Sequence, residues 1–400
     1  MWFGKSKNKL TPIAVDFGTD SVKLLQCTTD ASPRVFAAAA RVVPHDLRDD
    51  ADARRAWLTD AIAELTRVGG FSGRQAIASV PTPLTVVEHL RVVDGAEAAV
   101  HEQIAQDLGQ RMSVDPGRLV VRHVQPPSAD LDVSGKREVI AMAVGRGAIM
   151  HHIDILKAAK LTVVGMHVEP AAMMQAFAHL FRRATDQAKT SFFVDVGSRV
   201  TKALIAHGPA PAFTKLVQVG GEHFDQQFAR ELDVEIGEAR DRRRRQARDL
   251  DPATAAGATG PNASGGAPAG HRPDGGGSAA AAKLRKQVAV TSGEPSHEMI
   301  PAGGEMLDCL IDELQLCVSY HNALYSQRRI DRIVFLGGEA NQRAMCRRIA
   351  SELRLPGTLG DPLARMVGEE LKKATVGVVL TQSQPNWAVP LGLTRLPANL

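Results

Sequence analysis

Two short segments of the chain repeat one arrangement of an aspartate, a glycine, a hydroxyl residue and a lysine. The first, VDFGTDSVKLL, begins at Val15, and the second, VDVGSRVTKAL, begins at Val194. The aligned pairs are Asp16 with Asp195, Gly18 with Gly197, Thr19 with Ser198, and Lys23 with Lys202. Glycine lets the backbone turn tightly and approach a ligand, and successive N–H groups in such a turn form a concave site for an anion. Because the turn occurs twice, the sequence predicts phosphate groups gripped from both sides of a cleft.

Side chains in the two turns add to what the backbone offers. The hydroxyl groups that can donate to phosphate oxygens are those of Thr19, Ser21, Ser198 and Thr201. Asp16 and Asp195 each end an apolar run, where a carboxylate is expected to meet a hydrated Mg²⁺ on a polyphosphate. A single Asp-x-Gly-Thr turn also closes plain β-hairpins, so the pairing of two turns carries the interpretation. We therefore expect ATP and Mg²⁺ as cofactors, with Asp16 and Asp195 as metal ligands and ATP binding that depends on Mg²⁺.

A third element fits the same ligand. The segment IVFLGGEANQ is an apolar strand that ends in Gly337 and Gly338 and is followed at once by a helical pattern. Paired glycines allow the backbone to approach the base and ribose of a nucleotide, although a simple tight turn would use them equally well. The chain contains neither GxxxxGK[ST] nor GxGxxG, so P-loop and dinucleotide-binding interpretations find no support.

The elements that must position these turns occur in a repeated order. In the first half, apolar runs occupy 13–15, 22–25 and 35–43, with a helical pattern at 52–67 and a further run at 76–80. In the second half, runs occupy 192–194, 200–205 and 212–219, followed by a helix at 222–232 and later a long helix, the strand RIVFLG and another helix. Three strands followed by a helix and a strand, given twice, predict two similar α/β domains that face each other.

Between these halves lies a segment that predicts a small inserted α+β subdomain of strand, helix, two strands and helix. The expected divisions are 1–83 and 161–188 for the first domain, 84–160 for the inserted subdomain, 189–383 for the second domain, and 384–400 for a segment that returns to the first domain.

A low-complexity segment interrupts the second domain. From Pro252 to Ala282 the chain has no bulky apolar residue, so we expect a disordered loop at 251–282. The arginines Arg242–Arg245 precede it and have two interpretations. A basic run can bind lipid or nucleic acid, but a solvated helix end is the more ordinary explanation.

Composition excludes several classes of protein. A net charge of +4 over 400 residues argues against a dedicated nucleic-acid binder. The four cysteines form no CxxC pair and are expected to be reduced and buried, Cys309 among them, as in a cytoplasmic protein. The start MWFGKSKNKLTP has no apolar run behind it and no segment has the ~18 apolar residues of a membrane span, so membrane contact is expected to be indirect.

These segments together resemble the actin-like ATPase superfamily and, within it, the PilM family of type IV pilus assembly proteins. The likeness extends over most of the chain apart from the low-complexity segment. The segments that carry it are MWFGKSKNK, the two turns, HVEPAAMMQAF, FTKLVQVGGEHFDQQFARELDVEIGEA, VFLGGEANQ and PNWAVPLGLTRL. It implies two duplicated actin-like (RNase H-like) domains around a nucleotide cleft, with the inserted subdomain in the first half.

The resemblance also implies roles for individual residues. Asp16, Gly18, Thr19, Ser21 and Lys23 match the first phosphate turn, and Asp195, Gly197, Ser198 and Thr201 match the second. Gly220 and Gly221 match a Gly-Gly pair close to the ribose and phosphates, and Gly337 and Gly338 match the adenosine turn. Glu169, in VEPAA, resembles a glutamate near the attacking water, so Glu169 and Asp195 are the candidate catalytic residues of at most a slow ATPase.

The function implied is that of an ATP-binding scaffold of type IV pilus or related secretion machinery. Its partner would be the N-terminal tail of a PilN-like bitopic inner-membrane protein, with self-association into rings and no nucleic acid. Such a protein would be cytoplasmic and peripheral to the inner membrane. Two alternatives are an FtsA-like membrane-associated filament protein and a sugar-kinase-type phosphotransferase. The first usually has a basic amphipathic helix that the end LGLTRLPANL does not resemble, and the second needs a substrate-side aspartate that we do not find.

Overall fold

The structure is a computed structural model that describes residues 10–127, 135–181, 184–249, 289–290, 304–364, 366, 375–378, 380 and 382–398. The segment 251–282 lies outside these residues, as does the stretch 1–9.

The two main sheets are built in the same order. The first sheet runs β3-β2-β1-β4-β8, and the second runs β11-β10-β9-β13-β14-β12. In each, the first three strands pair antiparallel and the next two are added in parallel. The bounds in the first sheet are β1 Ile13–Phe17, β2 Ser21–Cys27, β3 Val35–Val42, β4 Gln75–Val80 and β8 Thr162–Val168. Those in the second are β9 Thr190–Val196, β10 Thr201–His207, β11 Ala210–Val217, β12 Ala289–Val290, β13 Arg332–Leu336 and β14 Gly357–Leu359. The duplicated α/β fold expected from the repeated order is confirmed.

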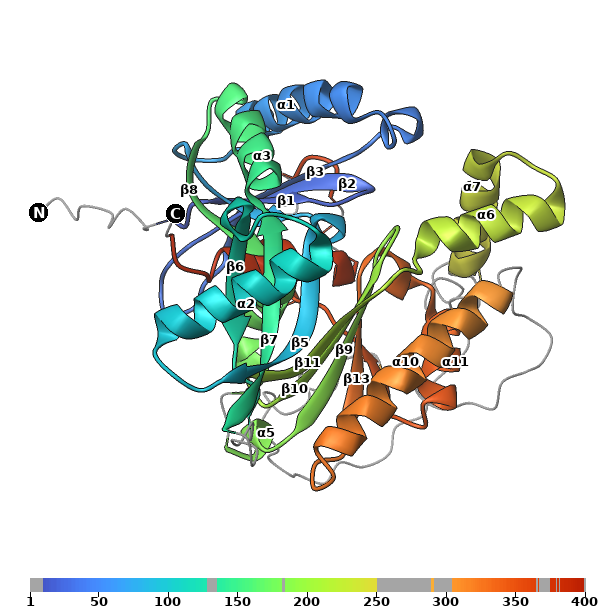
Figure 1. Cartoon of the computed structure of the whole chain (residues 1–400). Coiled ribbons are helices and arrows are strands. Elements are labelled where there is room, and N and C mark those ends of the chain that lie inside the picture. Colours follow the sequence, from blue (N-terminus) through green and yellow to red (C-terminus); the bar gives the residue numbers. More distant parts are fainter. Residues whose placement is uncertain are drawn as a thin grey trace, which may run out of the picture.

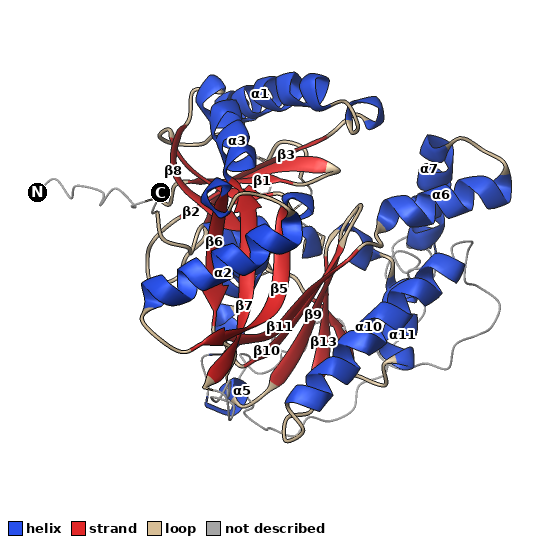
Figure 2. Ribbon diagram, viewed as in Figure 1, coloured by secondary structure: helices blue, strands red, loops and turns tan. Residues whose placement is uncertain are grey.

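Helices cover the outer face of each sheet (Figures 1 and 2). On the first sheet these are α1 (Ala51–Val68) and α3 (Arg146–Ala158), and on the second they are α10 (Gly304–Leu324) and α11 (Arg343–Glu352). The sequence explains this placement. Strands β1 and β9 are buried along their whole length, as expected for strands covered on both faces. Helix α1 begins at the cap of Asp50, whose carboxylate accepts N–H groups of Asp52 and Ala53, and it buries one side, including Leu58, Ile62 and Leu65.

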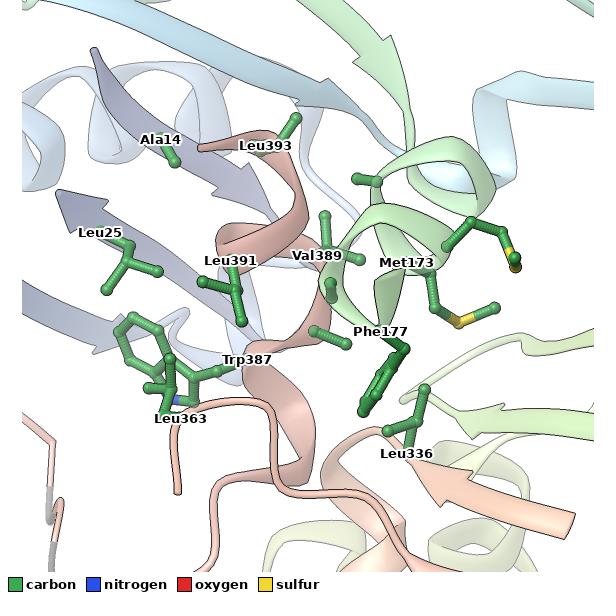
Figure 3. Close-up of a cluster of buried hydrophobic side chains, with 14 of the residues drawn as sticks. Ala14, Leu25, Met173, Phe177, Leu336, Leu363, Trp387, Val389, Leu391 and Leu393 are labelled. Atoms are coloured by element: carbon green, nitrogen blue, oxygen red, sulfur yellow. The ribbon is translucent and has the colours of Figure 1, made fainter. Parts of the chain in front are cut away.

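An apolar cluster joins the two halves of the molecule (Figure 3). Helix α12 (Ala388–Leu393) packs against α4 (Glu169–Ala176), with β1 and β2 of the first sheet beside it. Leu391 and Leu393 are fully buried there, and Phe193 and Leu336 of the second sheet belong to the same cluster. The short helix η8 (Pro385–Trp387) adds the buried Trp387. The cleft between the two sheets therefore has an apolar base.

The inserted part is a three-stranded sheet in the order β5-β7-β6 with one helix on it. Its elements are β5 Thr85–Val93, α2 Glu97–Met112, β6 Leu119–Val124 and β7 Lys136–Gly145. Helix α3, which the sequence assigned to this subdomain, instead places Ile155 and Leu156 in the core of the first sheet, against α1. The separate core of the inserted part contains side chains of α2 and the three strands. We therefore propose residue 145 rather than 160 as the end of the inserted subdomain.

The remaining described elements connect or flank those above. They are η1 His45–Leu47, η2 Thr82–Leu84, η3 Pro116–Arg118, η4 Ala178–Phe181, α5 Ala184–Gln187, α6 Gly221–Leu232, α7 Ile236–Asp249 and η6 Gly338–Asn341. The expectation of four buried cysteines was wrong for one of them. Cys309 of α10 is exposed, whereas Cys27, Cys317 and Cys346 are buried.

Candidate functional site

A cleft of about 120 Å³ lies between the two sheets and is lined by residues from both. It contains most residues that the sequence singled out, namely Asp16, Gly18, Thr19, Ser21, Lys23, Glu169, Asp195, Gly197, Ser198, Gly337 and Gly338. Residues that had not been assigned to the site also line it, namely Phe17, Asp20, Thr82, Pro83, Arg199, Val200, Lys202, Arg244, Glu339, Asn386, Ala388 and Val389. The structure thus brings together turns that lie far apart in the sequence.

The two turns have the same local geometry. A Cβ atom on Gly18 would lie 2.8 Å from the carbonyl oxygen of Ser21, and one on Gly197 would lie 2.8 Å from that of Val200. Both distances are too short for a carbon, so each turn requires glycine for its close approach to the chain three residues on.

The two turns are held in place by different groups. In the first, the guanidinium of Arg54 on α1 donates to the carbonyl oxygens of Thr19 (3.2 Å) and Gly18 (3.0 Å). In the second, the first backbone N–H groups of α6 bind the carbonyl oxygens of the turn: that of Gly221 donates to Gly197 (2.9 Å) and that of Glu222 to Ser198 (2.7 Å). Because the carbonyl groups of both turns are bound from behind, the opposite side of each turn faces the cleft.

Three of the predicted ligand-binding residues lie outside the cleft lining. The Thr201 hydroxyl is buried and donates to the carbonyl oxygen of Val219 at 2.7 Å. A Cβ on Gly220 would lie 2.6 Å from the carbonyl oxygen of Ser198, and one on Gly221 would lie 2.4 Å from the Glu339 carboxylate. These residues therefore support the second turn from behind, and their contact with a ligand stays a prediction that this geometry does not favour.

The glycines of the third element have two distinct surroundings. Gly337 has φ 88°, and a Cβ there would meet Val196 and the carboxylate of Asp195. This position needs glycine for both its conformation and its packing. A Cβ on Gly338 would have no atom within 4 Å, although the residue lines the cleft. The backbone of Gly338 therefore borders open space in which a ligand can lie.

Each turn places a lysine directly across the strand pair from its aspartate. Asp16 is paired in register with Lys23 between β1 and β2, and Asp195 with Lys202 between β9 and β10. The Lys23 ammonium lies 3.1 Å from Asp16, and the Lys202 ammonium lies 3.0 Å from Asp195. Lys202 also reaches Glu169 on α4, at 2.5 Å. The sequence alignment had paired these two lysines but had assigned only Lys23 to the site.

The charges of these buried groups depend on one another. Burial raises the pKa of Asp16, although the positive charge of Lys23 opposes this change. Burial also acts to raise the pKa of Glu169, but the charge and hydrogen bond of Lys202 outweigh it and leave the pKa below its ordinary value. Burial disfavours the charged form of Lys202, but Asp195 and Glu169 more than compensate and raise its pKa. Lys202 is therefore an ammonium and Glu169 a carboxylate at neutral pH.

The carboxylates that were expected to meet Mg²⁺ already have partners. Asp16 accepts from Lys23 and, through its other oxygen, from the Ser79 hydroxyl at 3.1 Å. Asp195 accepts from Lys202. Within the part of the chain that the structure describes, no group of three or more His, Cys, Asp or Glu side chains is placed to hold a metal ion. Magnesium prefers six oxygen ligands at 2.0–2.1 Å. These residues do not fit a directly coordinated Mg²⁺, and the assignment of Asp16 and Asp195 as its ligands stays an untested prediction.

Arginines of α7 close one end of the cleft. Arg243 is buried and pairs with Glu339 (2.6 Å) and Asp225 (2.7 Å), while Arg244 reaches Asp20 in the first turn at 3.1 Å. Arg240 joins Asp225 at 2.8 Å and Asp20 at 3.5 Å. The interpretation of Arg242–Arg245 as a solvated helix end was wrong for Arg243, because this side chain is paired inside the protein.

Besides the Lys202–Glu169 pair, two sets of ion pairs connect the halves across the cleft. Asp20 also pairs with Arg48, and although burial acts to raise the pKa of Asp20, the neighbouring arginines hold it below its ordinary value. Arg199 of the second turn pairs with Asp49 of the first half and with Glu222. These contacts join segments that are distant in sequence, so no local pattern could have revealed them. They keep the two halves close together.

The family described as type IV pilus assembly protein PilM matches residues 14–252, which is more than half of the chain. The chain belongs to the PilM family. This assignment confirms the resemblance that the doubled turn and its neighbouring segments indicated. Comparison with curated protein sequences finds no match.

A solved structure has the same fold as this PilM-family chain. A structure described as the PilM-PilN type IV pilus biogenesis complex has a TM-score of 0.68 at 17% sequence identity, and the alignment covers 97% of this chain and 98% of that one. The ethanolamine utilization protein EutJ from Carboxydothermus hydrogenoformans has a TM-score of 0.49 at 14% identity, with 98% of this chain and 91% of that chain covered. At the identity of the first structure the likeness establishes the fold, and with it the actin-like architecture expected from the sequence.

The relation of the chain to a membrane was tested on its helices. Among the described residues, no helix combines the length and the apolar character needed to cross a membrane.

Proposed function

We propose that this PilM-family chain is a nucleotide-binding scaffold in which ATP lies in the cleft between the two turns. The observation that carries the proposal is the convergence of both turns and of Gly337–Gly338 on one cleft. Backbone N–H groups of the turns, with the half-buried Thr19, Ser21 and Ser198, suit phosphate oxygens. The open space beside Gly338 suits the flat part of a nucleotide.

The ion pairs across the cleft give the nucleotide a structural role. At about 120 Å³ the cleft is smaller than the roughly 300 Å³ at which ligand pockets begin. A nucleotide therefore enters only when pairs such as Arg244–Asp20 and Arg199–Asp49 open. Bound phosphates can then take over the arginines as partners. In this proposal ATP sets the relative orientation of the two halves.

The surroundings of Glu169 favour binding over hydrolysis. One oxygen of this carboxylate accepts from Lys202 and the other accepts the N–H of Thr82 at 3.0 Å. With both oxygens engaged and a lowered pKa, Glu169 is a weak base toward water. A phosphotransferase would need a free carboxylate in a second pocket, whereas the cleft carboxylates Asp16, Glu169 and Asp195 are each paired with a lysine. At most a slow ATPase is expected.

The nucleotide part is tested with Gly338→Leu. A Cβ there would have no protein atom within 4 Å and Gly338 lines the cleft, so the variant should keep its fold and lose ATP binding by at least about tenfold in calorimetry. Gly147→Leu is the matched control, because a Cβ there also has no atom within 4 Å and Gly147 is exposed away from the cleft. Equal ATP affinity in wild type and Gly338→Leu would contradict the proposed site.

We further propose that the scaffold binds the N-terminal tail of a PilN-like membrane protein and contacts the inner membrane through it. The structural relative described as a PilM-PilN complex supports this proposal, together with membership of the family. The groove we favour lies between the inserted sheet and the first domain. Strand β5 is an edge strand of the inserted sheet, and its middle is in contact with β11 through His89, whose ring packs on Phe213. A peptide strand beside the ends of β5 would gain main-chain hydrogen bonds and side-chain pockets.

The partner proposal is tested by retention of a short synthetic peptide from the N-terminal end of a PilN-like bitopic membrane protein on the immobilised chain. Leu84, the last residue of η2 before β5, and Val93, the last residue of β5, are exposed apolar side chains (42% and 53%) whose replacement by glutamate leaves the core intact. Leu84→Glu or Val93→Glu should abolish retention. Leu232→Glu, at an equally exposed leucine (41%) on α6, should retain the peptide. Retention by all three variants would contradict this groove.

A further inference from the structure

The cleft suits the proposed nucleotide but does not suit the Mg²⁺ that would accompany it. Five carboxylates line it, namely Asp16, Asp20, Glu169, Asp195 and Glu339, against four cations, namely Lys23, Lys202, Arg199 and Arg244. A polyphosphate brings further negative charge to this place. Cations are therefore required near the phosphates, and the paired state of the carboxylates leaves no ready position for Mg²⁺.

Lys202 has the connections that a bridging metal ion would have. Its ammonium binds Glu169 of α4, on the first half, and Asp195 of β9, on the second half, at 2.5 and 3.0 Å. The side chain is buried and contributes to the lining of the cleft. An ammonium carries three N–H donors. Two are used by these carboxylates, so one remains for a phosphate oxygen.

Lys23 repeats this arrangement in the first turn. Its ammonium binds one carboxylate, that of Asp16, and also lines the cleft, so that two N–H donors remain for a ligand. The other oxygen of Asp16 is held by Ser79, which keeps the carboxylate directed at its lysine. The phosphates would thus meet an ammonium from each turn.

We propose that Lys202, with Lys23 opposite it, provides inside the protein the positive charge that a divalent cation would bring to the nucleotide, so that ATP binding is independent of Mg²⁺. The proposal rests on the proposed nucleotide site and replaces the expectation that binding depends on this metal. A mobile Mg²⁺ between the same oxygens would have to displace the ammonium, whose high pKa keeps it charged.

The first test uses the wild-type protein alone. Calorimetric titration of ATP in excess Mg²⁺ and in excess EDTA should give dissociation constants within about threefold of each other. A loss of about tenfold or more in EDTA would overturn the proposal while leaving the nucleotide site in place. An absence of ATP binding in both conditions would instead contradict the proposed function.

The second test needs no nucleotide, so it examines the exclusion of a divalent cation by Lys202 separately from ATP binding. Lys202→Ala leaves Glu169 and Asp195 facing each other without a cation, and Mg²⁺ or Mn²⁺ can then occupy the space. Either metal alone should raise the melting temperature of this variant by about 2–4 °C and leave the wild type unchanged. The control is Lys215→Ala, which removes a half-exposed lysine paired with Glu313 outside the cleft and should show no response.

Two further variants keep the test informative if Lys202→Ala does not fold. Lys202→Ala combined with Glu169→Gln removes one of the two facing charges, so it should be more stable than Lys202→Ala and respond less to metal. Lys202→Arg keeps a cation and should retain ATP binding in EDTA. Failure of Lys202→Ala to respond to metal, or equal metal responses in Lys202→Ala and the double variant, would overturn the proposal.

Discussion

The hairpins β1–β2 and β9–β10 share a local sequence but differ in what surrounds them. In the first, Ser79 binds Asp16 and Arg54 binds the turn carbonyl oxygens, and both partners belong to the same half as the turn. Of the residues in this turn, Asp20 has the partners from the second half that were described above. In the second, the lysine reaches Glu169 across the base of the cleft, and α6 holds the turn with its backbone. Both hairpins thus form ion pairs with the other half, the first through Asp20 in its turn and the second also through the lysine of its strand.

The difference shows where a duplicated motif acquires a specific role. The cross-strand pairs Asp16–Lys23 and Asp195–Lys202 follow from register alone and are equivalent. A third partner, Glu169, is present only for the pair Asp195–Lys202, because this first residue of α4 lies beside Lys202. We infer that the contacts of Lys202 depend on the relative position of the halves, whereas the Asp16–Lys23 pair does not.

The largest effect is expected from removing the two lysines in turn. Lys202→Ala leaves two buried carboxylates without a partner and should cost about 3–5 kcal/mol of unfolding free energy. Lys23→Ala should cost less, since Asp16 keeps its bond from Ser79 and its raised pKa already eases protonation. Thermal and urea unfolding of both variants would measure the difference. Equal losses would mean that contact with Glu169 adds nothing to the second hairpin.

An intermediate effect is expected from the supports behind the turns. Gly220→Ala would place a methyl group 2.6 Å from the carbonyl oxygen of Ser198, and overpacking of this kind costs about 1–3 kcal/mol. Arg54→Ala removes two hydrogen bonds to the first turn from a side chain and should cost about 1 kcal/mol, because water can replace them. Unfolding in urea would rank the two variants. A greater loss for Arg54→Ala than for Gly220→Ala would contradict the expectation that the second turn, which backbone groups of α6 hold, tolerates substitution of its support less than the first turn does.

The smallest effect is expected from pH and concerns the far end of the second hairpin. Burial, with nearby His321 and Arg328, lowers the pKa of His207 from 6.5 to about 4. The unfolded chain therefore binds this proton at higher pH than the folded protein does, so stability is complete above pH 6.5 and falls as the pH drops toward 4. Hydrogen exchange should show β10 opening before β2, whose sequence SVKLLQC has no histidine. His207→Gln should weaken this pH dependence, and an unchanged dependence would assign it to another group.

Local sequence was sufficient for the fold and for about half of the site. The repeated order of strands and the aligned Asp, Gly and Lys residues are consequences of register and turn geometry, which a short segment determines. The contacts of Lys202 with Glu169, and of Arg244 with Asp20, depend instead on how two domains are oriented. The burial of Arg243 also arises from this orientation, so its charge run resembled an exposed one in sequence. The sequence placed helix α3 in the inserted subdomain rather than on the first sheet for the same reason, because the pattern of an amphipathic helix does not specify which sheet it covers.

The position of α12 in the chain has a consequence for how the protein is made. This helix lies among Ala14, Leu25 and Met173, yet it is synthesised after every described strand of both sheets (Figure 3). A growing chain can form the hairpins and the outer helix layers early, because those contacts are local. It cannot complete the base of the cleft until residues 388–393 have left the ribosome. Until then the apolar surface of α4 stays uncovered, so closure of the two halves is a late event of biosynthesis and the nascent chain depends on protection from aggregation.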